Sequence, residues 1–463
     1  MKKGIVSLGI ISITLLCIYC SRPLDFSHEA LSGGAYYTSY NFSKDAFGVQ
    51  GDDLSREQSR LFQAGNFLFR TNWVEAPASV NSLDGIGPLF NANSCGSCHF
   101  KDGRAAPPDE PGGSPFGLLW RIHTGIQEEN GAPGEHPIYG SQIQDHALPD
   151  IQAEASVRIT YDTLHFTYPD GTPYTLFMPQ YTLQDPGYKD LDPGYTLAPR
   201  IAPQVAGLGL LDNIPEQAIL DNEDIEDKDG DGISGKANYV WDQVNKGMSL
   251  GRFGWKANQP SILQQNAGAF NGDMGLTTSL FPEEEYSAYQ KARNPKKRSG
   301  GEPEVSDEQL ARITLYVKTL AIPAKRNIDE PLYAAGRALF YEIGCEACHT
   351  ASFTTGTTDS IETLNGQIIY PYSDLLLHDM GEGLADGRPD FKASGREWRT
   401  APLWGIGLIK TVNKHTRLLH DGRARNIEQA ILWHAGEAEQ SKTDFTELSA
   451  EEREALIFFV ESL

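Results

Sequence analysis

The sequence predicts a mostly α-helical protein built from two related domains, of which the first carries a large insertion of loops and β-strands. Three short features each occur twice, in the same order, along the 463 residues. They are AGNFLF (64–69) with AGRALF (335–340), CGSCH (95–99) with CEACH (345–349), and SDEQLARITLYVKTL (306–320) with SAEEREALIFFVESL (449–463). Duplication of one structural unit is the simplest explanation of three ordered repeats.

The third feature predicts a closing helix in each half. Ser306 with Gln309, and Ser449 with Glu452, have the spacing of a capping box, which satisfies the first backbone amides of a helix. Apolar residues then recur at helical spacing, at Leu310, Ile313, Val317 and Leu320 and at Leu456, Val460 and Leu463. Each half is therefore expected to contain a helix, a Cys-x-x-Cys-His segment, a long excursion and a closing helix.

The repeats divide the chain into expected domains. We expect an N-terminal domain over residues 61–322, with an insertion at 104–300, and a C-terminal domain over residues 332–463. Residues 21–60 form an N-terminal extension, and AIPAKRNIDEP (321–331) is the expected linker. Within the insertion, residues 157–179 alternate around Asp170–Gly171, which predicts a β-hairpin.

The first 20 residues have the features of an export signal. Lys2 and Lys3 precede an apolar run that ends at Cys20 and is shorter than the ~20 residues that span a bilayer. A cysteine at that place favours a lipoprotein in the periplasm, anchored to a membrane through a lipid on Cys20. Plain secretion and an uncleaved anchor remain alternatives, because Cys17, Ile18 and Tyr19 depart from the usual pattern before a lipidated cysteine.

The charge and the cysteine count exclude some kinds of partner and some uses of the cysteines. A net charge of −23 argues against nucleic acid and anionic lipid surfaces as partners, because both require basic patches. Two of the six cysteines belong to the signal segment, and the other four form two Cys-x-x-Cys pairs. Every cysteine after the signal segment is thus used in a pair, and none is left for a structural disulfide.

A histidine follows each pair directly, which is the attachment signal for c-type haem. The two thiols bond to the haem, and the histidine ligates the iron. The alternatives are a zinc site and two redox-active pairs, but zinc has no need of a following histidine, and the βαβ pattern around redox pairs is absent. The sequence thus predicts two covalent haems c in cytochrome c-like domains, held by Cys95, Cys98 and His99 and by Cys345, Cys348 and His349.

The sixth iron ligand decides whether a haem only transfers electrons or also catalyses a reaction. Only an iron whose sixth position is open or weakly held reacts with peroxide or dioxygen. In the second half, Asn426 and Gln429 predict the start of a helix on which Ile427, Ala430, Ile431 and His434 share one apolar face. On position alone, His434 is either a core histidine or an inward-pointing ligand.

Several longer segments resemble the di-haem peroxidase superfamily, which includes bacterial di-haem cytochrome c peroxidases, MauG enzymes and rubber oxygenases. The resemblance is strongest to its branch of di-haem oxidoreductases, also called thiol oxidoreductases. The segments are GPLFNANSCGSCH (87–99), DKDGDGISGKANYVW (227–241), GRFGWKANQPSILQQNAGAFNGDMG (251–275), YPYSDLLLHDMGEGLADG (370–387), GREWRTAPLWGIG (395–407) and LHDGRARNIEQAILWHAGEA (419–438).

The resemblance implies roles for particular residues. In the superfamily a residue fourteen positions after an HDG motif ligates the C-terminal haem, and that position here is His434. The C-terminal haem is then bis-histidine and stores electrons, while the N-terminal haem is catalytic. Its sixth position is open, or is held by Met274 or His123. Three tryptophans near these segments are either electron relays or ordinary core residues: Trp255, Trp404 and Trp120.

The segment DKDGDGISGKAN (227–238) has the spacing of a calcium loop. Asp227, Asp229 and Asp231 stand at positions 1, 3 and 5, and the carbonyl of Ile233 stands at position 7. Asn238 replaces the usual glutamate at position 12, so a charged surface turn is the alternative. We expect a bound Ca²⁺, which the resemblance also favours because di-haem peroxidases hold calcium between their haem domains.

The sequence therefore predicts an exported di-haem oxidoreductase that reduces H₂O₂, or activates O₂, at the N-terminal haem. Electrons would come from a small redox protein such as a cytochrome c, through the C-terminal haem. The alternatives are a di-haem electron carrier and an oxidant of a macromolecular substrate, like MauG or the rubber oxygenases. Thiol oxidation has no support, because haem or lipid accounts for every mature thiol.

Overall fold

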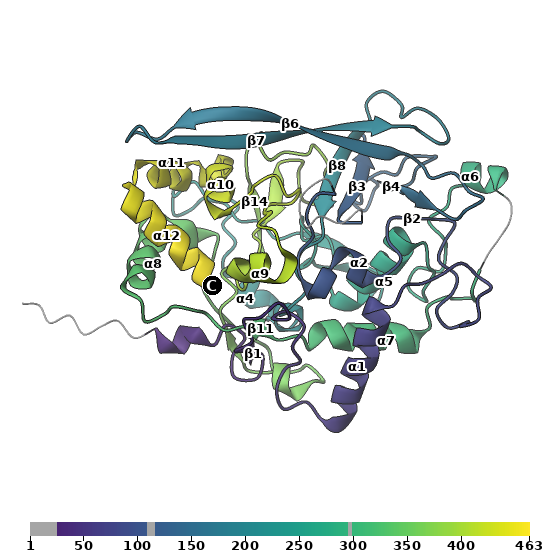
Figure 1. The fold of residues 1–463 in the computed structure, drawn as a ribbon, viewed down its shortest axis with the longest axis horizontal. Helices are drawn as coiled ribbons and strands as arrows, with labels where there is room; N and C mark the ends of the chain where they lie inside the picture. Colours follow the sequence, from purple (N-terminus) through teal and green to yellow (C-terminus); the bar gives the residue numbers. More distant parts are fainter. Residues whose placement is uncertain (1–25, 109–115, 295–298) are drawn as a thin grey trace, which may run out of the picture.

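The computed structural model describes residues 26–108, 116–294 and 299–463 (Figure 1). The predicted signal segment 1–20, including Cys20, lies outside these ranges. The described part is mixed α/β, with 30% helix and 19% strand, so the prediction of a mostly α-helical protein is only partly right. None of the helices in the described ranges is long and apolar enough to cross a membrane.

Two similar helix pairs form the frame of the molecule. Helix α1 (Arg56–Arg70) packs against α7 (Asp307–Lys318), and α8 (Pro331–Glu342) packs against α12 (Ala450–Ser462). The capping boxes predicted for α7 and α12 are both present. Figure 1 shows the α1–α7 pair at the lower right and the α8–α12 pair at the left.

The repeated Ala-Gly dipeptide allows the helices of each pair to cross closely. A Cβ atom at Gly65 would lie 2.2 Å from the carbonyl oxygen of Arg312 on α7. A Cβ atom at Gly336 would lie 1.9 Å from the carbonyl oxygen of Ala455 on α12. The first and third sequence repeats therefore form the same kind of helix crossing twice.

The remaining α-helices are mostly short. They are α2 (Cys95–Cys98), α3 (Leu208–Asp212), α4 (Glu216–Leu220), α5 (Ile262–Met274), α6 (Ala288–Arg293), α9 (Ile409–Asn413), α10 (Ile427–Leu432) and α11 (Glu439–Glu447). Of these, α5 packs on α7 in the first half, and α10 packs on α12 in the second.

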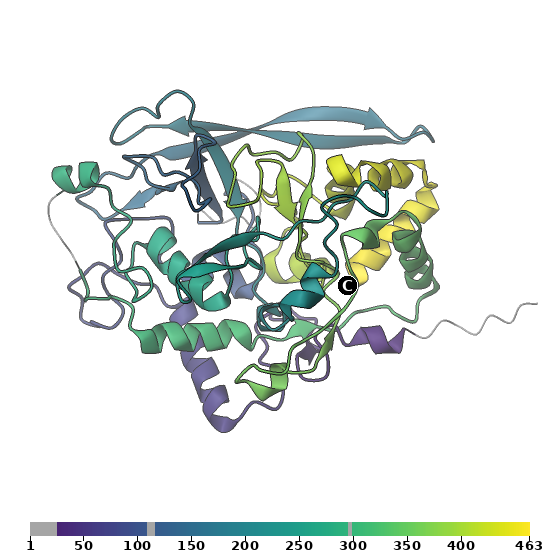
Figure 2. The same ribbon diagram turned by 180° about the vertical axis from the view of Figure 1, so that it is seen from behind.

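The predicted hairpin is confirmed, and its second strand is longer than expected. Strand β6 (Ser156–Thr167) pairs antiparallel with β7 (Pro173–Gln184) around a turn in which Gly171 has φ of 90°. Figures 1 and 2 show the hairpin along one side of the molecule, next to α10 and α11 at one end. The side chain of Gln429 on α10 donates to the carbonyl of Thr175 at 2.9 Å, so the insertion is fastened to the C-terminal half.

The other strands are short and form small sheets. One sheet has the order β4 (Gln142–Ile143), β3 (Leu118–His123) and β8 (Thr196–Ile201). The remaining pairs are β1 (Thr38–Ser39) with β11 (Ile322–Pro323), β2 (Leu89–Phe90) with β5 (His146–Ala147), β9 (Tyr239–Asp242) with β10 (Gly247–Leu250), β12 (Phe353–Thr354) with β13 (Ile368–Ile369), and β14 (Leu377–Asp379) with β15 (Glu397–Arg399). The strands of the insertion are the main reason why helices do not dominate.

The N-terminal extension and the expected linker pair with each other. Strand β1 of the extension runs parallel to β11, which lies within residues 321–331. One buried apolar cluster includes residues of both halves, among them Phe62, Val317, Phe340 and Leu456. The division of the chain into two separate cytochrome c-like domains therefore remains a prediction.

Candidate haem and redox site

One cavity of about 440 Å³ lies among the two helix pairs, and residues of α1, α7, α8 and α12 contribute to its wall. Both Cys-x-x-Cys-His segments line it, although they are far apart in the sequence. The cavity brings together the predicted residues Cys95, Cys98, His99, Met274, Cys345, Cys348, His349 and His434.

Each Cys-x-x-Cys-His segment folds as a single tight turn. The backbone amide of His99 donates to the carbonyl of Cys95 at 2.9 Å, and that of His349 donates to the carbonyl of Cys345 at 3.0 Å. Residues three and four positions apart lie on one face of such a turn. The turn thus presents two thiols and an imidazole to the same side, in both halves.

Burial disfavours the charged thiolate form of all four cysteines, because it raises their pKa values. All four are free cysteines, and burial raises the pKa of Cys95 and of Cys345 to about 12. Among the described residues, the acidic group Asp227, Asp229 and Asp231 is the only cluster of three potential metal-ligating side chains within 4.8 Å of one another. The two cysteine pairs therefore do not gather into a zinc site.

Three histidines at the cavity have the same hydrogen-bond arrangement. Nδ1 of His99 lies 2.6 Å from the carbonyl oxygen of Pro203, and Nδ1 of His349 lies 2.9 Å from that of Tyr372. Nδ1 of His434 lies 2.7 Å from the carbonyl oxygen of Ala430. A proton on Nδ1 that donates to a carbonyl leaves Nε2 free to bind a metal, which is the usual arrangement of ligating histidines.

Electrostatics keep these imidazoles neutral. Burial lowers the pKa of His99 and of His434, and it lowers the pKa of His349 to about 4. His349 and His434 line the same cavity, and the charge that His434 would carry also lowers the pKa of His349. A neutral imidazole is the form that ligates iron.

The position of His434 differs slightly from the prediction. Helix α10 starts at the Asn426 cap as expected but ends at Leu432, so His434 lies just beyond the helix and not on its face. The Nδ1 contact with Ala430, one turn back, fixes the ring where it lines the cavity.

An aromatic ring lies beside each histidine of the paired motifs. The ring centroids of Phe69 and His99 are 6.2 Å apart, and those of Phe340 and His349 are 6.3 Å apart. Phe69 and Phe340 end the repeated AGxxLF segments on α1 and α8. The first repeat therefore places equivalent phenylalanines against both Cys-x-x-Cys-His turns.

The two candidates for the sixth ligand of the first haem differ in the structure. Met274 is 3% exposed, ends α5 and lines the cavity. The adjacent carbonyl of Asp273 accepts the amides of Asn91 and Ala92 at 2.7 and 2.9 Å, so the end of α5 is fastened beside the first motif. Met274 thus remains a candidate ligand.

His123 is engaged elsewhere. Its Nε2 lies 2.7 Å from the hydroxyl of Thr196 and 3.1 Å from the carbonyl of Asp386, while Nδ1 accepts from the amide of Gly125 at 3.1 Å. Both ring nitrogens therefore have partners in the insertion and the C-terminal half, and His123 is not part of the cavity wall.

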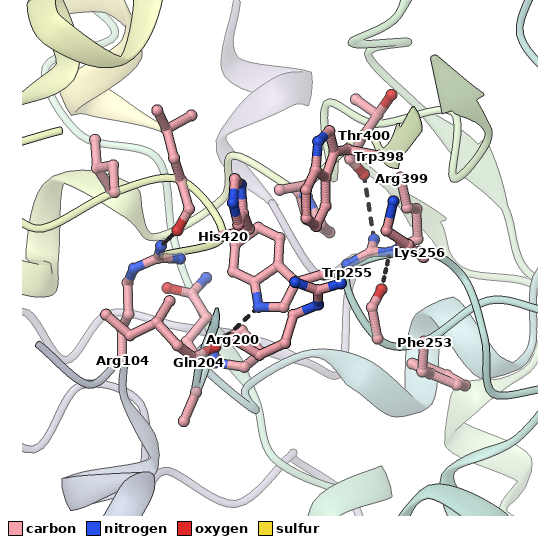
Figure 3. A pocket seen from close by; sticks show the side chains of 18 of the residues that line it. Arg104, Arg200, Gln204, Phe253, Trp255, Lys256, Trp398, Arg399, Thr400 and His420 are labelled. Carbon is pink, nitrogen blue, oxygen red and sulfur yellow. Dashed lines mark hydrogen bonds between the residues drawn. The ribbon is translucent and has the colours of Figure 1, made fainter. Parts of the chain in front are cut away.

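A cluster of cations and aromatic rings completes the cavity wall, and sequence reasoning missed it (Figure 3). The imidazole of His420 stacks on Trp398 with centroids 3.7 Å apart. Nζ of Lys256 lies 4.2 Å from the Trp398 ring centroid and 3.5 Å from a carboxylate oxygen of Asp386. Arg200 also pairs with Asp386. The sequence contains a tryptophan followed by a cation in each half, at Trp255–Lys256 and Trp398–Arg399, and this pattern could have indicated the cluster.

Two cations of the cavity wall, the buried Arg104 and the partly buried Arg399, form no ion pair with a carboxylate among the described residues. The guanidinium of Arg104 donates to the carbonyls of Arg417 and Leu419, and that of Arg399 donates to the carbonyls of Gly254 and Thr400. Burial lowers the pKa of Arg104 to about 9 and that of Arg399 to about 10.

The carboxylates of Asp421 and Asp374 only partly offset the lowering of these pKa values, and a guanidinium without a direct carboxylate partner favours an anionic ligand. A haem carries two propionate carboxylates, and both arginines line the cavity that holds the Cys-x-x-Cys-His turns. The residues present therefore fit two haems in charge as well as in attachment chemistry.

The tryptophans separate into two groups. Trp255 and Trp404 line the cavity, and the indole N–H of Trp255 donates to the carbonyl of Ile201 at 2.8 Å. Trp120 belongs to a second apolar cluster and is not part of the cavity wall. Two of the three relay candidates thus lie where the haems are expected.

The predicted calcium loop gathers its carboxylates on the surface. Ligand oxygens of Asp227, Asp229 and Asp231 lie within 4.8 Å of one another. The amide of Ile233 donates to Asp231 at 2.8 Å. Asn238 is buried, and its side-chain amide donates to the carbonyl of Lys256 at 2.7 Å. This contact holds its side chain in the interior, whereas the three carboxylates lie on the surface.

Comparisons with known proteins give one informative match. A family model described as "Di-haem oxidoreductase, putative peroxidase" matches residues 26–114 and 141–463. No curated protein matches the chain significantly. Among solved structures, a Kuenenia stuttgartiensis hydrazine synthase pressurised with xenon is 13% identical over 100% of both chains, with a TM-score of 0.35. A likeness at that level carries no argument.

Proposed function

Because this chain belongs to the family of di-haem oxidoreductases, we propose that it is an exported enzyme that reduces H₂O₂, or activates O₂, with two covalent haems c. Membership of the family implies two haems and a redox function. The observation that carries the more specific proposal is the single cavity lined by both Cys-x-x-Cys-His turns.

In this proposal a particular set of residues binds each haem. Cys95 and Cys98 bond one haem, with His99 as its ligand, and Cys345, Cys348 and His349 hold the other. The free Nε2 atoms and the neutral state of the imidazoles support these roles. Arg104 and Arg399, which line the cavity, would pair with the haem carboxylates.

Bound haem supplies an iron that changes oxidation state and reacts with H₂O₂ or O₂ where its sixth position is open or weakly held. The surrounding side chains supply the environment. Carbonyl partners orient the three imidazoles, while apolar residues of the helix pairs limit water at the cavity.

The two haem sites have different tasks in this proposal. His434 lines the same cavity as His349 and, like it, has Nδ1 held by a backbone carbonyl, which supports a bis-histidine C-terminal site that stores electrons. Near His99 the candidate is the thioether of Met274, a weaker ligand than an imidazole, or the position is open. The N-terminal site is therefore where the oxidant reacts, and Trp255 and Trp404 line the cavity that both motifs share.

The proposed partner is a small basic electron donor such as a cytochrome c. The net charge of −23 supports electrostatic attraction of such a donor. Location in the periplasm, with a lipid anchor at Cys20, rests on the sequence of residues 1–20.

Calcium in the loop of Asp227, Asp229 and Asp231 is a further part of the proposal, supported by the convergence of the three carboxylates. Isothermal titration of the chelator-treated protein with Ca²⁺ tests it, with Asp229→Asn as the variant expected to lose binding. Equal heats from the two proteins would contradict a calcium site.

Single-haem variants test the main proposal. Replacing Cys95 and Cys98 with alanine should abolish H₂O₂ turnover with reduced cytochrome c but leave one low-spin haem that is still reducible. Replacing Cys345 and Cys348 should leave a haem that reacts with H₂O₂ but receives electrons slowly from the donor.

The wild-type ferric spectrum separates the alternatives. We expect one high-spin or weakly ligated haem and one low-spin haem. Two low-spin haems without peroxide turnover would identify an electron carrier. Uptake of O₂ without a cytochrome donor would instead identify an oxidant of the MauG or rubber-oxygenase kind.

A further inference from the structure

A buried carboxylate in the N-terminal extension is linked through Tyr372 to the C-terminal Cys-x-x-Cys-His turn. Glu29, in the short 3₁₀-helix η1 (Ser27–Ala30), is only 3% exposed. Its carboxylate oxygens lie 2.9 Å from Nζ of Lys325 and 2.6 Å from Nη2 of Arg337. Two cations from later parts of the chain thus hold one acidic group of the extension.

The hydroxyl of Tyr372 joins the same cluster. It donates to Oε2 of Glu29 at 3.0 Å and accepts from Nζ of Lys325 at 3.1 Å. The tyrosine ring is completely buried and meets Phe340 and Phe459 edge-on, at centroid distances of 5.7 and 5.8 Å. Hydrogen bonds therefore fix the hydroxyl of Tyr372, and aromatic contacts fix its ring.

The backbone of Tyr372 is the part that touches the haem ligand. Its carbonyl accepts from Nδ1 of His349 at 2.9 Å. Its φ is 53°, a left-handed conformation that is strained for a residue with a side chain and persists only where the surroundings impose it. The next two amides, of Ser373 and Asp374, donate to the carbonyls of Thr350 and Cys348 at 2.9 and 3.0 Å.

We propose that Glu29 is a positioning residue for the C-terminal haem, acting through Tyr372 on the orientation and basicity of His349. The inference rests on the proposed function, in which His349 ligates iron. The cluster fixes the tyrosine ring, the ring holds the strained backbone, and the backbone carbonyl takes the Nδ1 proton. A firm hydrogen bond at Nδ1 raises the basicity of a ligating imidazole and so favours ferric over ferrous iron.

The N-terminal haem site provides a natural contrast. His99 donates to the carbonyl of Pro203, and the proline ring itself restricts the backbone there. A change in the Glu29 cluster should therefore act on one haem and leave the other as an internal reference.

The variant Tyr372→Phe tests the chain of contacts, since it removes one hydroxyl and keeps the ring and the carbonyl. In the di-haem protein we expect the midpoint potential of the bis-histidine haem to rise. The ferrous-to-ferric ratio should increase by on the order of threefold, the worth of one ordinary hydrogen bond. The electron paramagnetic resonance signal of that haem should also shift, because it reports the orientation of the axial imidazoles.

Glu29→Gln should shift the same haem in the same direction. The matched control is Tyr333→Phe, because Tyr333 is equally buried and packs on Phe459 at 5.2 Å, but its hydroxyl has no hydrogen-bond partner in the described part of the chain. This control should move neither haem.

An unchanged C-terminal haem in Tyr372→Phe and Glu29→Gln overturns the inference, as does an equal shift in Tyr333→Phe or in both haems. Mass analysis of the wild-type peptides keeps the two proposals apart. A missing haem at Cys345 and Cys348 refutes the proposed function and this inference with it, whereas a haem that is present but unresponsive refutes the inference alone.

Discussion

At the scale of single residues, the surroundings of each side chain decide its chemistry more than its type does. His123 and His434 are both largely enclosed histidines. Both nitrogens of His123 have partners, whereas Nδ1 of His434 contacts a carbonyl and its ring lines the cavity. Only a histidine with a free nitrogen facing a cavity can ligate a metal.

The first residue-scale prediction concerns His434. His434→Ala should convert the C-terminal haem from low-spin to high-spin iron, because His349 then has no strong partner across the iron. A visible spectrum of the ferric protein measures this change. His165→Ala, at an exposed position on the hairpin, is the control and should leave the spectrum unchanged. A fully low-spin His434→Ala protein would show that another group binds there.

The second residue-scale prediction concerns Asp386 and acid stability. Burial alone raises the pKa of Asp386, but the neighbouring Arg200 and Lys256 outweigh burial and lower this pKa to about 2. Its usual value in an unfolded chain is about 3.9. Because the folded-state pKa is the lower one, the carboxylate stabilises the fold above about pH 4, and this contribution disappears as the pH falls towards 2.

Asp386→Asn should therefore lower the free energy of unfolding at pH 7 by about 3–5 kcal/mol, since it leaves buried cations unpaired. Denaturant unfolding of the haem-loaded proteins should show the difference between them narrowing by about 2–3 kcal/mol between pH 4 and pH 2. A difference that stays constant over that range would mean that the charge of Asp386 is not the cause.

At the scale of elements, two helix crossings determine where the haem-binding turns lie. Gly65 and Gly336 permit the crossings, and Phe69 and Phe340, four residues further on, contact the two histidines. The repeated segment AGxxLF thus combines a close helix contact with a wall of the haem site.

Gly65→Ala and Gly336→Ala should each destabilise the protein by about 1–3 kcal/mol, because the added methyl group meets a backbone carbonyl that cannot move aside. Thermal unfolding measures the loss. Gly268→Ala in α5 is the matched control, since the nearest atom to its Cβ is 3.9 Å away. This control should be neutral or stabilising, by up to about 1 kcal/mol, because alanine favours a helix over glycine. Equal losses at all three glycines would refute the packing explanation.

At the scale of the whole molecule, the acidic surface should govern association with the electron donor. The net charge of −23 attracts a basic protein. Salt screens this attraction, and the screening length is about 10 Å at 0.1 M ionic strength. The bimolecular rate with a basic cytochrome c should therefore fall steeply as salt rises. Stopped-flow oxidation of reduced cytochrome measures it, with an acidic cytochrome as the control whose rate should rise. A rate independent of salt would argue against electrostatic steering.

Features that depend on neighbouring residues were predictable from the chain. The capping boxes at Ser306 and Ser449, the Asn426 cap and the Asp170–Gly171 hairpin all form as expected, because each rests on hydrogen bonds or alternation within a few residues. The low helix content was missed, since the strands of the insertion pair across long loops that local patterns do not specify.

The sequence by itself determined the two Cys-x-x-Cys-His turns, the duplicated helices around them and the family to which the chain belongs. Only the tertiary structure decided that both turns share one cavity, that Arg104 and Arg399 line it without carboxylate partners, and that Glu29 reaches Tyr372. The physical reason is the distance along the chain. Periodicity and capping describe contacts within one turn or one strand, whereas a cavity and a buried ion cluster arise when distant segments pack together.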